Sequence, residues 1–247
     1  SALLIAGDEK QKSAYLPKIA SGELFTALAV DEGPHHDPFH IALAARKSSG
    51  GYTLTGEKRY VVAGAAANLL IVAARPSGQA GDTSGITLFL VRGAAKGVTR
   101  TALKTLDAHP AANITFANVE VGADAVLGPV DGGHAVLESI LDRARIGLAA
   151  EMLGASDAAF EMTAEYRKVR KQFGQLIGSF QSLQHRAAVM FTELELTRSC
   201  VAAALAALDS NANNVAELAS LAKARAGETL HLVSNETVQM HGGIGMT

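Results

Sequence analysis

Four basic residues stand close together in the stretch 166–181, which reads YRKVRKQFGQLIGSFQ. They are Arg167, Lys168, Arg170 and Lys171, and they fall where one long helical pattern ends, before a Phe-Gly pair and a second helical pattern. Cations at such a junction can hold an anionic, nucleotide-like group. They can also complement the negative end of the helix dipole, which needs no ligand. The cluster alone leaves both interpretations open.

A second candidate site is the stretch 239–245, which reads QMHGGIG. Gly242 and Gly243 would close a third helical pattern and let the backbone come close to a ligand. A glycine after a helix is common, so this motif is weak by itself. Two such motifs at the same end of a helical bundle are more informative than either one.

Other chemistries find little support in the sequence. His35, His36 and His40 form an HHxxxH pattern, but no Cys, Asp or Glu pattern completes it, so we expect no metal site. There is no nucleophile elbow, P-loop or dinucleotide-binding glycine motif after a strand. The single cysteine, Cys200, excludes an intrachain disulfide and gives no redox motif.

Composition points to an ordinary folded protein. The 247 residues are 48% hydrophobic and 19% charged, with a net charge of −2, so we expect neither nucleic-acid nor membrane-surface binding. The chain opens SALLIAGDEKQK, which is neither a membrane span nor a signal peptide, and we expect a cytoplasmic protein. This opening has no starting Met and reads as part of a helical region, which favours a fragment of a longer chain.

The elements that would position these motifs change character along the chain. A short amphipathic helix is predicted over residues 8–20. Between residues 25 and 128, six β-type runs are separated by Gly, Pro, Asn and Asp clusters, as in an antiparallel sandwich or barrel. The runs are FTALAVD, FHIALAAR, GYTLTGEKRYVV, NLLIVAAR, GITLFLVR and NITFANVEV. Gly50-Gly51 and Thr55-Gly56 are predicted to form tight turns.

Beyond Gly128 the pattern is helical to the end. Three long helices are predicted, over about 131–171, 179–209 with Ser179 as N-cap, and from Asn213 or Asn214 to His241. Apolar residues recur every three or four positions in the second helix, as in a bundle. The predicted fold class is therefore α+β, an antiparallel β-barrel or sandwich followed by an antiparallel helical bundle. The predicted domains are a helical remnant at 1–24, a β-domain at 25–128 and an incomplete helical domain at 129–247.

These residues resemble one known family, the acyl-CoA dehydrogenases, and the resemblance runs over nearly the whole chain. The segments that carry it are DEKQKSAYLPKIASGE, GYTLTGEKRYVVAGAAANLLIVAAR, RIGLAAEMLG, YRKVRKQFGQLIGSFQSLQH and QMHGGIG. The last two are specific to the family, and their spacing here is also right.

The resemblance implies a non-covalent FAD between the β-domain and the helical bundle, shared across a subunit interface. It implies that FAD of the neighbouring subunit is held by Arg170, Gln172, Phe173 and Gln181, and that its pyrophosphate and adenosine region meets Gln239, Gly242 and Gly243. Buried phosphates need a guanidinium and backbone donors in place of water. A tetramer is implied, either a homotetramer or a heterotetramer, with FAD at the subunit interfaces.

The implied reaction is α,β-dehydrogenation of an acyl-CoA in fatty acid metabolism, with electron-transferring flavoprotein or a similar acceptor. The family's usual glutamate base lies beyond the GGIG motif, and this sequence ends at Thr247. In a second group of the family, the base lies one residue before an arginine that matches Arg145. The residue at that position in this sequence is Ala144, which cannot act as a base. By the same resemblance, Arg145 is expected to bind the substrate. The catalytic base is therefore unassigned. Asp142 and Arg143 either face solvent or line a cleft, and the sequence does not choose.

The sequence also departs from the family where the flavin ring would sit. Tyr60 and Val62 replace the usual Trp and Thr, which keeps an aromatic shield but removes a side-chain hydrogen bond. The loop DEGPHHDP keeps only Glu32 of the family pattern, and Asp31 there would disfavour an anionic reduced flavin. An alternative function is therefore a non-catalytic or half-site subunit of a heteromeric dehydrogenase. Acyl-CoA oxidases and flavin monooxygenases of the same fold are further alternatives.

Overall fold

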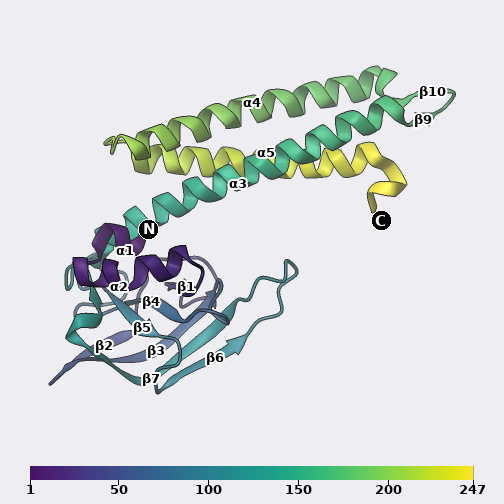
Figure 1. The fold of residues 1–247 in the computed structure, drawn as a ribbon. Helices are drawn as coiled ribbons and strands as arrows, with labels where there is room; N and C mark the ends of the chain where they lie inside the picture. Colours follow the sequence, from purple (N-terminus) through teal and green to yellow (C-terminus); the bar gives the residue numbers. More distant parts are fainter. Residues whose placement is uncertain (247) are drawn as a thin grey trace. The chain divides into compact units, whose positions relative to one another are not determined.

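A computed structural model describes residues 1–246 (Figure 1). The chain forms two compact units, residues 1–140 and the residues from Leu141 onward. Helix α3 (Gly133–Val169) is continuous and contributes to both units. In the part of the chain that the structure describes, no helix combines the length and apolar character needed to cross a membrane.

The first unit holds two short helices, α1 (Ala2–Ala6) and α2 (Glu9–Ala20), and two four-stranded sheets. One sheet has the order β1 (Thr26–Ala29), β4 (Leu69–Ala74), β5 (Thr87–Arg92) and β8 (Val126–Leu127). The other has the order β2 (Ala44–Ser48), β3 (Gly51–Val61), β7 (Ala112–Gly122) and β6 (Val98–Ala102). Neighbouring strands are antiparallel except β1 and β4, which are parallel. The predicted antiparallel β-domain is confirmed.

One core fills the space between the two sheets. Val72 and Phe89 from the first sheet pack with Leu54 and Phe116 from the second, and all four side chains are buried. Every residue of β4 is buried, because this strand lies between β1 and β5 and is covered on both faces. Burying each large apolar side chain contributes about 1.5–3 kcal/mol, so this core holds the loops at its edges in place.

Two predictions for this unit are wrong in detail. Gly56 does not form a turn: it lies inside β3, at a bulge between Leu54 and Gly56. A Cβ there would lie 2.9 Å from Cγ of Leu43, so a close approach requires the glycine. The run from Phe39 becomes a strand only at Ala44. Strand β6 was not among the predicted runs, because it is short and mostly polar at a sheet edge.

The N-terminal turn of α2 is fixed by a cap and by side-chain hydrogen bonds. Asp8 is its N-cap and forms a capping box with Gln11. The Gln11 amide also donates to the carbonyls of Asp124 and Val126, at 3.0 and 2.8 Å. The helix predicted over residues 8–20 is therefore confirmed, and it is tied to the turn after β7 and to the first residue of β8.

The second unit is an antiparallel bundle of three long helices (Figure 1). The part of α3 from Leu141 onward leads into a hairpin of β9 (Lys171–Gln172) and β10 (Gln175–Leu176), followed by α4 (Gln181–Asp209) and α5 (Val215–His241). The 3₁₀ turns η2 (Ile177–Ser179) and η3 (Gly242–Met246) flank α4 and α5. Its core includes Leu153, Leu194, Val201 and Val233.

The starts of α4 and α5 show how well the residues near a helix end predict its first residue. Helix α5 begins directly after Asn214, one of the two starts predicted, although the Asn214 side chain makes no cap hydrogen bond. Ser179 is not the N-cap of α4: it belongs to η2, and its hydroxyl donates to the carbonyl of Leu176 at 2.6 Å. Helix α4 begins at Gln181 after Phe180, with no side-chain cap. Ser179 satisfies the preceding turn instead, a local alternative that serine often takes.

Candidate functional site

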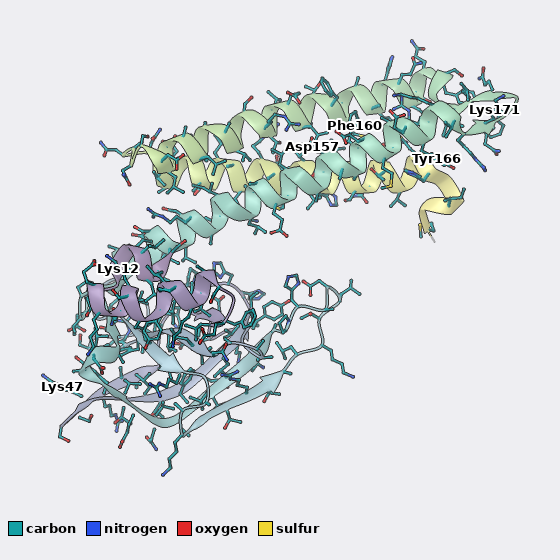
Figure 2. The ribbon with its side chains drawn as sticks, viewed as in Figure 1. Lys12, Lys47, Asp157, Phe160, Tyr166 and Lys171 are labelled. Atoms are coloured by element: carbon teal, nitrogen blue, oxygen red, sulfur yellow. The ribbon has the colours of Figure 1, made fainter. Side chains whose placement is uncertain are left out.

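The two candidate motifs lie at the same end of the helical unit. Tyr166, from the last turns of α3, stacks on His241, the last residue of α5, with ring centroids 4.3 Å apart and planes inclined by 23°. One turn further back, the Thr163 hydroxyl donates to the Thr237 hydroxyl at 3.1 Å. Figure 2 shows Tyr166 and Lys171 near this end. The basic stretch and the glycine stretch therefore form one surface.

The third helix joins the same end through an ion pair. Nε of Arg186, near the start of α4, lies 2.8 Å from Oε2 of Glu236 on α5. Nδ1 of His241 lies 2.8 Å from the carbonyl oxygen of Thr237, so Nδ1 carries the proton and Nε2 is left as an acceptor in neutral histidine. These contacts fix the side chains around the motifs before any ligand is present.

The four basic residues divide into two pairs. Arg167 and Lys168 lie in the last turn of α3, where they complement the helix dipole, and Lys168 pairs with Glu165. Arg170 and Lys171 lie past the helix end and are exposed. Within residues 1–246, no carboxylate lies within ion-pair distance of either. Dipole compensation therefore explains the first pair, while the second is available to an external anion.

The tip of the β9–β10 hairpin has an unusual backbone. Phe173 has a φ of 55° and is followed by Gly174 at 80°. Consecutive left-handed residues form the turn that suits a two-residue hairpin, but a bulky residue there is disfavoured by about 1–2 kcal/mol. The Phe173 side chain is also 90% exposed, and its ring meets only the edge of Phe180 among described aromatic rings, at 6.2 Å. Strain with exposure is typical of a binding residue.

The glycine stretch, residues 239–245, also has a backbone that suggests a binding role. Gly242 ends α5 with a φ of 62°, so its own conformation requires glycine, and its N–H bonds to the Gln239 carbonyl. Gly243 has no such requirement, and a Cβ there would meet nothing within 4 Å. Gly178 is different, because a Cβ there would lie 2.8 Å from the carbonyl oxygen of Arg167. Internal packing thus accounts for Gly178 but not for Gly243, which leaves room for an outside group.

The glutamines predicted to bind the cofactor are on the surface. Gln172, Gln181 and Gln239 are all exposed at this end of the bundle. Gln172 donates through its amide to the carbonyl of Lys171 at 2.8 Å, and this contact holds it against the hairpin. The seven predicted residues of the two motifs therefore share one exposed end of the helical unit.

A second cluster of predicted residues lies in the sheet unit. Tyr60 has a φ of 47°, and its N–H is bonded to Oδ1 of Asn113 at 3.0 Å. Tyr60 and Val62 are each 56% exposed at the end of β3. Tyr60 and residues 104–107 line an open hollow of about 630 Å³. Tyr60 can therefore present its ring to a ligand, whereas Val62 offers only a methyl surface.

The loop that follows β1 is held by its two acids. The Asp31 carboxylate lies 2.9 Å from Nδ1 of His36 and accepts from the N–H of Asp37 at 3.1 Å. The carbonyl of Asp31 accepts from the N–H of Arg59 at 2.7 Å, which brings Asp31 beside Tyr60. His36 is thereby occupied, and within residues 1–246 no three metal-ligating side chains come together.

The sequence motifs did not single out Lys58, a residue of β3 whose side chain binds this loop. Its side chain is fully buried, and Nζ donates to the Val30 carbonyl at 2.8 Å and to Oε1 of Glu32 at 2.6 Å. The Glu32 carboxylate also accepts from the N–H groups of Ala42 and Leu43. Burial lowers the pKa of Lys58 to about 8, although Glu32 opposes the shift. Alternation along β3 places Lys58 on the buried side with Leu54, a signal that could have revealed it.

Arg145 is engaged within its own helix. Its Nη1 donates to Oδ1 of Asp142 at 2.7 Å, three residues earlier on α3. Asp142 is buried and Arg145 is half-buried. Asp142 therefore does not lie on a fully solvated face, and Arg145 keeps further donors beyond this pair.

The sequence and the fold define a family. Two family models match the chain: acyl-CoA dehydrogenase, middle domain, over residues 31–119, and acyl-CoA dehydrogenase, C-terminal domain, over residues 131–247. The chain is 35% identical over 247 residues to the short/branched chain specific acyl-CoA dehydrogenase, mitochondrial, of Bos taurus, covering 98% of this chain and 56% of that protein. The chain belongs to the acyl-CoA dehydrogenase family.

Solved structures agree with this assignment. Butyryl-CoA dehydrogenase from Megasphaera elsdenii superimposes with a TM-score of 0.94 at 30% identity, covering 100% of this chain and 65% of that one. An FAD complex of PigA gives a TM-score of 0.94 at 25% identity, with the same coverage of both chains. The chain thus spans only part of these relatives, and little more than half of the bovine enzyme.

Proposed function

We propose that this chain is part of an FAD-dependent acyl-CoA dehydrogenase that introduces an α,β double bond into an acyl-CoA thioester. The observation that carries the proposal is the stack of Tyr166 on His241, which joins the two family motifs into one surface. Membership of the family supports the reaction class, and the FAD named for the PigA structure supports the cofactor. The predicted cytoplasmic location remains a prediction.

The residues present fit a flavin dinucleotide. Within residues 1–246, no carboxylate lies within ion-pair distance of Arg170 or Lys171, and a Cβ at Gly243 would meet nothing within 4 Å, so the backbone there is open to close approach. A pyrophosphate is bound most strongly by guanidinium groups and backbone N–H groups. Gln172, Gln181 and Gln239 add amide donors and acceptors, and Phe173 adds an exposed aromatic face. We infer that these residues hold FAD of a neighbouring subunit in a homotetramer or heterotetramer.

Residues of the sheet unit would face the flavin ring. When bound, FAD would accept the hydride that leaves the β carbon of the thioester. Tyr60 would cover the ring and Val62 would contribute only apolar contact. The Asp31 carboxylate already binds His36 and Asp37, so its negative charge is partly offset before a flavin binds. We assign no catalytic base; Arg145 is proposed to contact the substrate through donors left over from Asp142.

Anaerobic reduction tests this function on the full protein that contains this chain. The purified, FAD-saturated protein is mixed with short straight-chain and branched-chain acyl-CoA thioesters, the classes named for the relatives. We expect bleaching of the visible flavin band and, with an artificial acceptor, formation of the enoyl-CoA. Electron-transferring flavoprotein or a similar acceptor would then restore the colour. A colourless protein that ignores added FAD contradicts the proposal.

The same experiment distinguishes an active dehydrogenase from the alternative, a non-catalytic or half-site subunit. A half-site subunit would show no bleaching alone but would gain activity when co-expressed with a homologous dehydrogenase subunit. The replacement of a hydroxyl by Val62 is the feature that favours this alternative. Full activity of the homomer would exclude it.

A further inference from the structure

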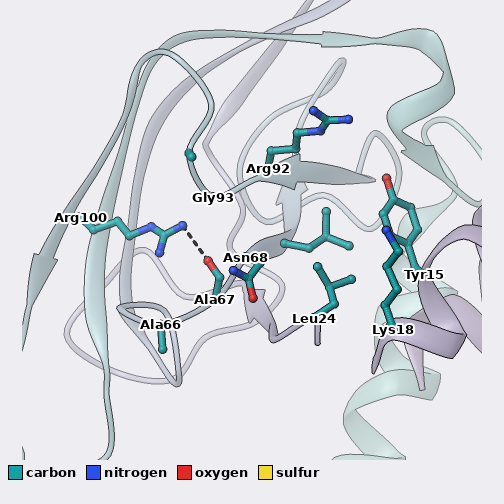
Figure 3. Close-up of a pocket in the computed structure, with 11 residues that line it drawn as sticks. Tyr15, Lys18, Leu24, Ala66, Ala67, Asn68, Arg92, Gly93 and Arg100 are labelled. Atoms are coloured by element: carbon teal, nitrogen blue, oxygen red, sulfur yellow. Dashed lines mark hydrogen bonds between the residues drawn. The ribbon is translucent and has the colours of Figure 1, made fainter. Parts of the chain in front are cut away.

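A cavity of about 560 Å³ lies in the sheet unit, among the end of α2, the start of β4 and the region between β5 and β6. Figure 3 shows three cationic side chains around it: Lys18 from α2, Arg92 from the end of β5 and Arg100 from β6. Its volume is that of a small-molecule site. None of the residues predicted to contact FAD lines it, so it is separate from the flavin surface.

Arg100 is held in position before any ligand binds. Its guanidinium donates to the carbonyl of Ala67 at 2.7 Å (Figure 3) and to the carbonyl of Ala65 at 3.2 Å. Gly93 makes this possible, because a Cβ at that position would lie 1.6 Å from Nη2 of Arg100. The absence of a side chain at Gly93 therefore allows the Arg100 guanidinium to take this position. The guanidinium has five N–H groups, so it keeps further donors for a ligand.

The other polar groups of the cavity are donors as well. Lys18 and Arg92 are exposed, and within residues 1–246 neither lies within ion-pair distance of a carboxylate. Oδ1 of Asn68 accepts from the N–H of Phe25 at 2.9 Å, which leaves its amide nitrogen to donate. The hydroxyl of Tyr15 is a further donor.

The charge of the cavity is unbalanced. No Asp or Glu is among the residues that line it. Glu120 and Asp124 line a neighbouring hollow, and neither forms an ion pair with Arg92 there. Three cations therefore line the cavity and no lining residue is acidic, an arrangement that an anionic ligand stabilises. A phosphate carries about −1.5 to −2 charges at neutral pH, which matches three cations better than a single carboxylate does.

We propose that this cavity binds a small molecule with a phosphate group, whose apolar part lies against Leu24 and Leu69. The guanidinium of Arg100 provides fixed donors, Arg92 and Lys18 close over the phosphate, and the Tyr15 ring offers an aromatic face. The site does not depend on the proposed dehydrogenase reaction. Its ligand is an additional anion, not the flavin.

Calorimetric titration of the full, FAD-saturated protein tests the site, with phenyl phosphate and inorganic pyrophosphate as probes. Saturation with FAD prevents the probes from entering the flavin site. We expect saturable binding of phenyl phosphate that weakens as salt is added. Arg92→Gln and Lys18→Gln should each weaken binding about tenfold. Both side chains are exposed, so neither change should disturb folding. Lys47→Gln, an exposed lysine on β2 outside the cavity, is the matched control.

Benzoate distinguishes phosphate from a general preference for aromatic anions. We expect it to bind at least about tenfold more weakly than phenyl phosphate, because it carries a single charge. Absence of saturable phosphate binding would overturn the proposal. Equal binding by the Arg92→Gln, Lys18→Gln double variant, or equal affinity for benzoate, would overturn it as well.

Discussion

The ring of Tyr166 stacks on that of His241, with centroids 4.3 Å apart and planes inclined by 23°, and this contact joins two motifs that are distant in sequence. Such a pair contributes about 0.5–1.5 kcal/mol beyond its buried area. We expect Tyr166→Ala to lower the free energy of unfolding by about 1 kcal/mol or more and to weaken FAD retention. Tyr166→Phe keeps the stack and should retain both. Equal FAD affinity of the alanine variant would show that the stack does not position the site.

A substitution at Phe173 can distinguish a role in binding from a role in folding, because the left-handed backbone there is disfavoured for a bulky residue. Phe173→Gly should leave thermal stability unchanged or slightly higher, since glycine adopts this conformation readily. The same change should lower FAD affinity and subunit association, measured by flavin content and sedimentation. Phe180→Leu is a useful comparison, because it changes the neighbouring ring at an ordinary φ of −72°. A clear loss of stability in Phe173→Gly would mean that the ring supports the fold.

Lys58 predicts a pH dependence of stability. Its pKa is about 8 in the folded chain and 10.5 when unperturbed, so between these values the unfolded chain holds the proton more tightly. Stability attributable to this group should therefore rise from about pH 8 to about pH 10.5, and should not change below pH 8. The measurement is denaturant unfolding of wild type and Lys58→Met across this range. A difference between the two that stays constant, or falls, would contradict the shift.

The buried hydroxyls of Thr197 and Thr229 form a hydrogen bond of 2.7 Å between α4 and α5. Thr197→Val leaves a buried hydroxyl without its partner, which costs about 1–3 kcal/mol. Replacing both by valine should cost less than the sum of the two single changes, because no polar group is then left unpaired. Urea unfolding of the four proteins gives the coupling directly. Strict additivity would show that the hydroxyls do not depend on each other.

The sequence predicted what depends on local periodicity. The change from alternating to helical spacing near Gly128 and the start of the last helix after Asn214 follow from residues that are neighbours in the chain. Ser179 and Gly56 were assigned by the same rules and were wrong. In each case a nearby contact outweighed the local preference, the turn at Leu176 for Ser179 and the Leu43 side chain for Gly56.

The sequence predicted which residues belong to the candidate site, but it did not predict how they are arranged in space. The resemblance pointed to Arg170 and Gly243, yet only the folded chain shows that Tyr166 and His241 touch. The buried Lys58 could not be foreseen from its charge, which normally favours the surface. It is buried because Glu32 and the Val30 carbonyl together bind its ammonium group.

The central claim is that the exposed basic hairpin and the glycine stretch hold a flavin dinucleotide. Titration of FAD into the full protein that contains this chain tests it most directly, with Arg170→Gln compared with Lys168→Gln. Arg170 has no carboxylate partner among the described residues, whereas Lys168 pairs with Glu165 on α3. We predict that Arg170→Gln weakens FAD binding about tenfold or more and that Lys168→Gln changes it little. Equal FAD affinity of wild type and Arg170→Gln would contradict the account.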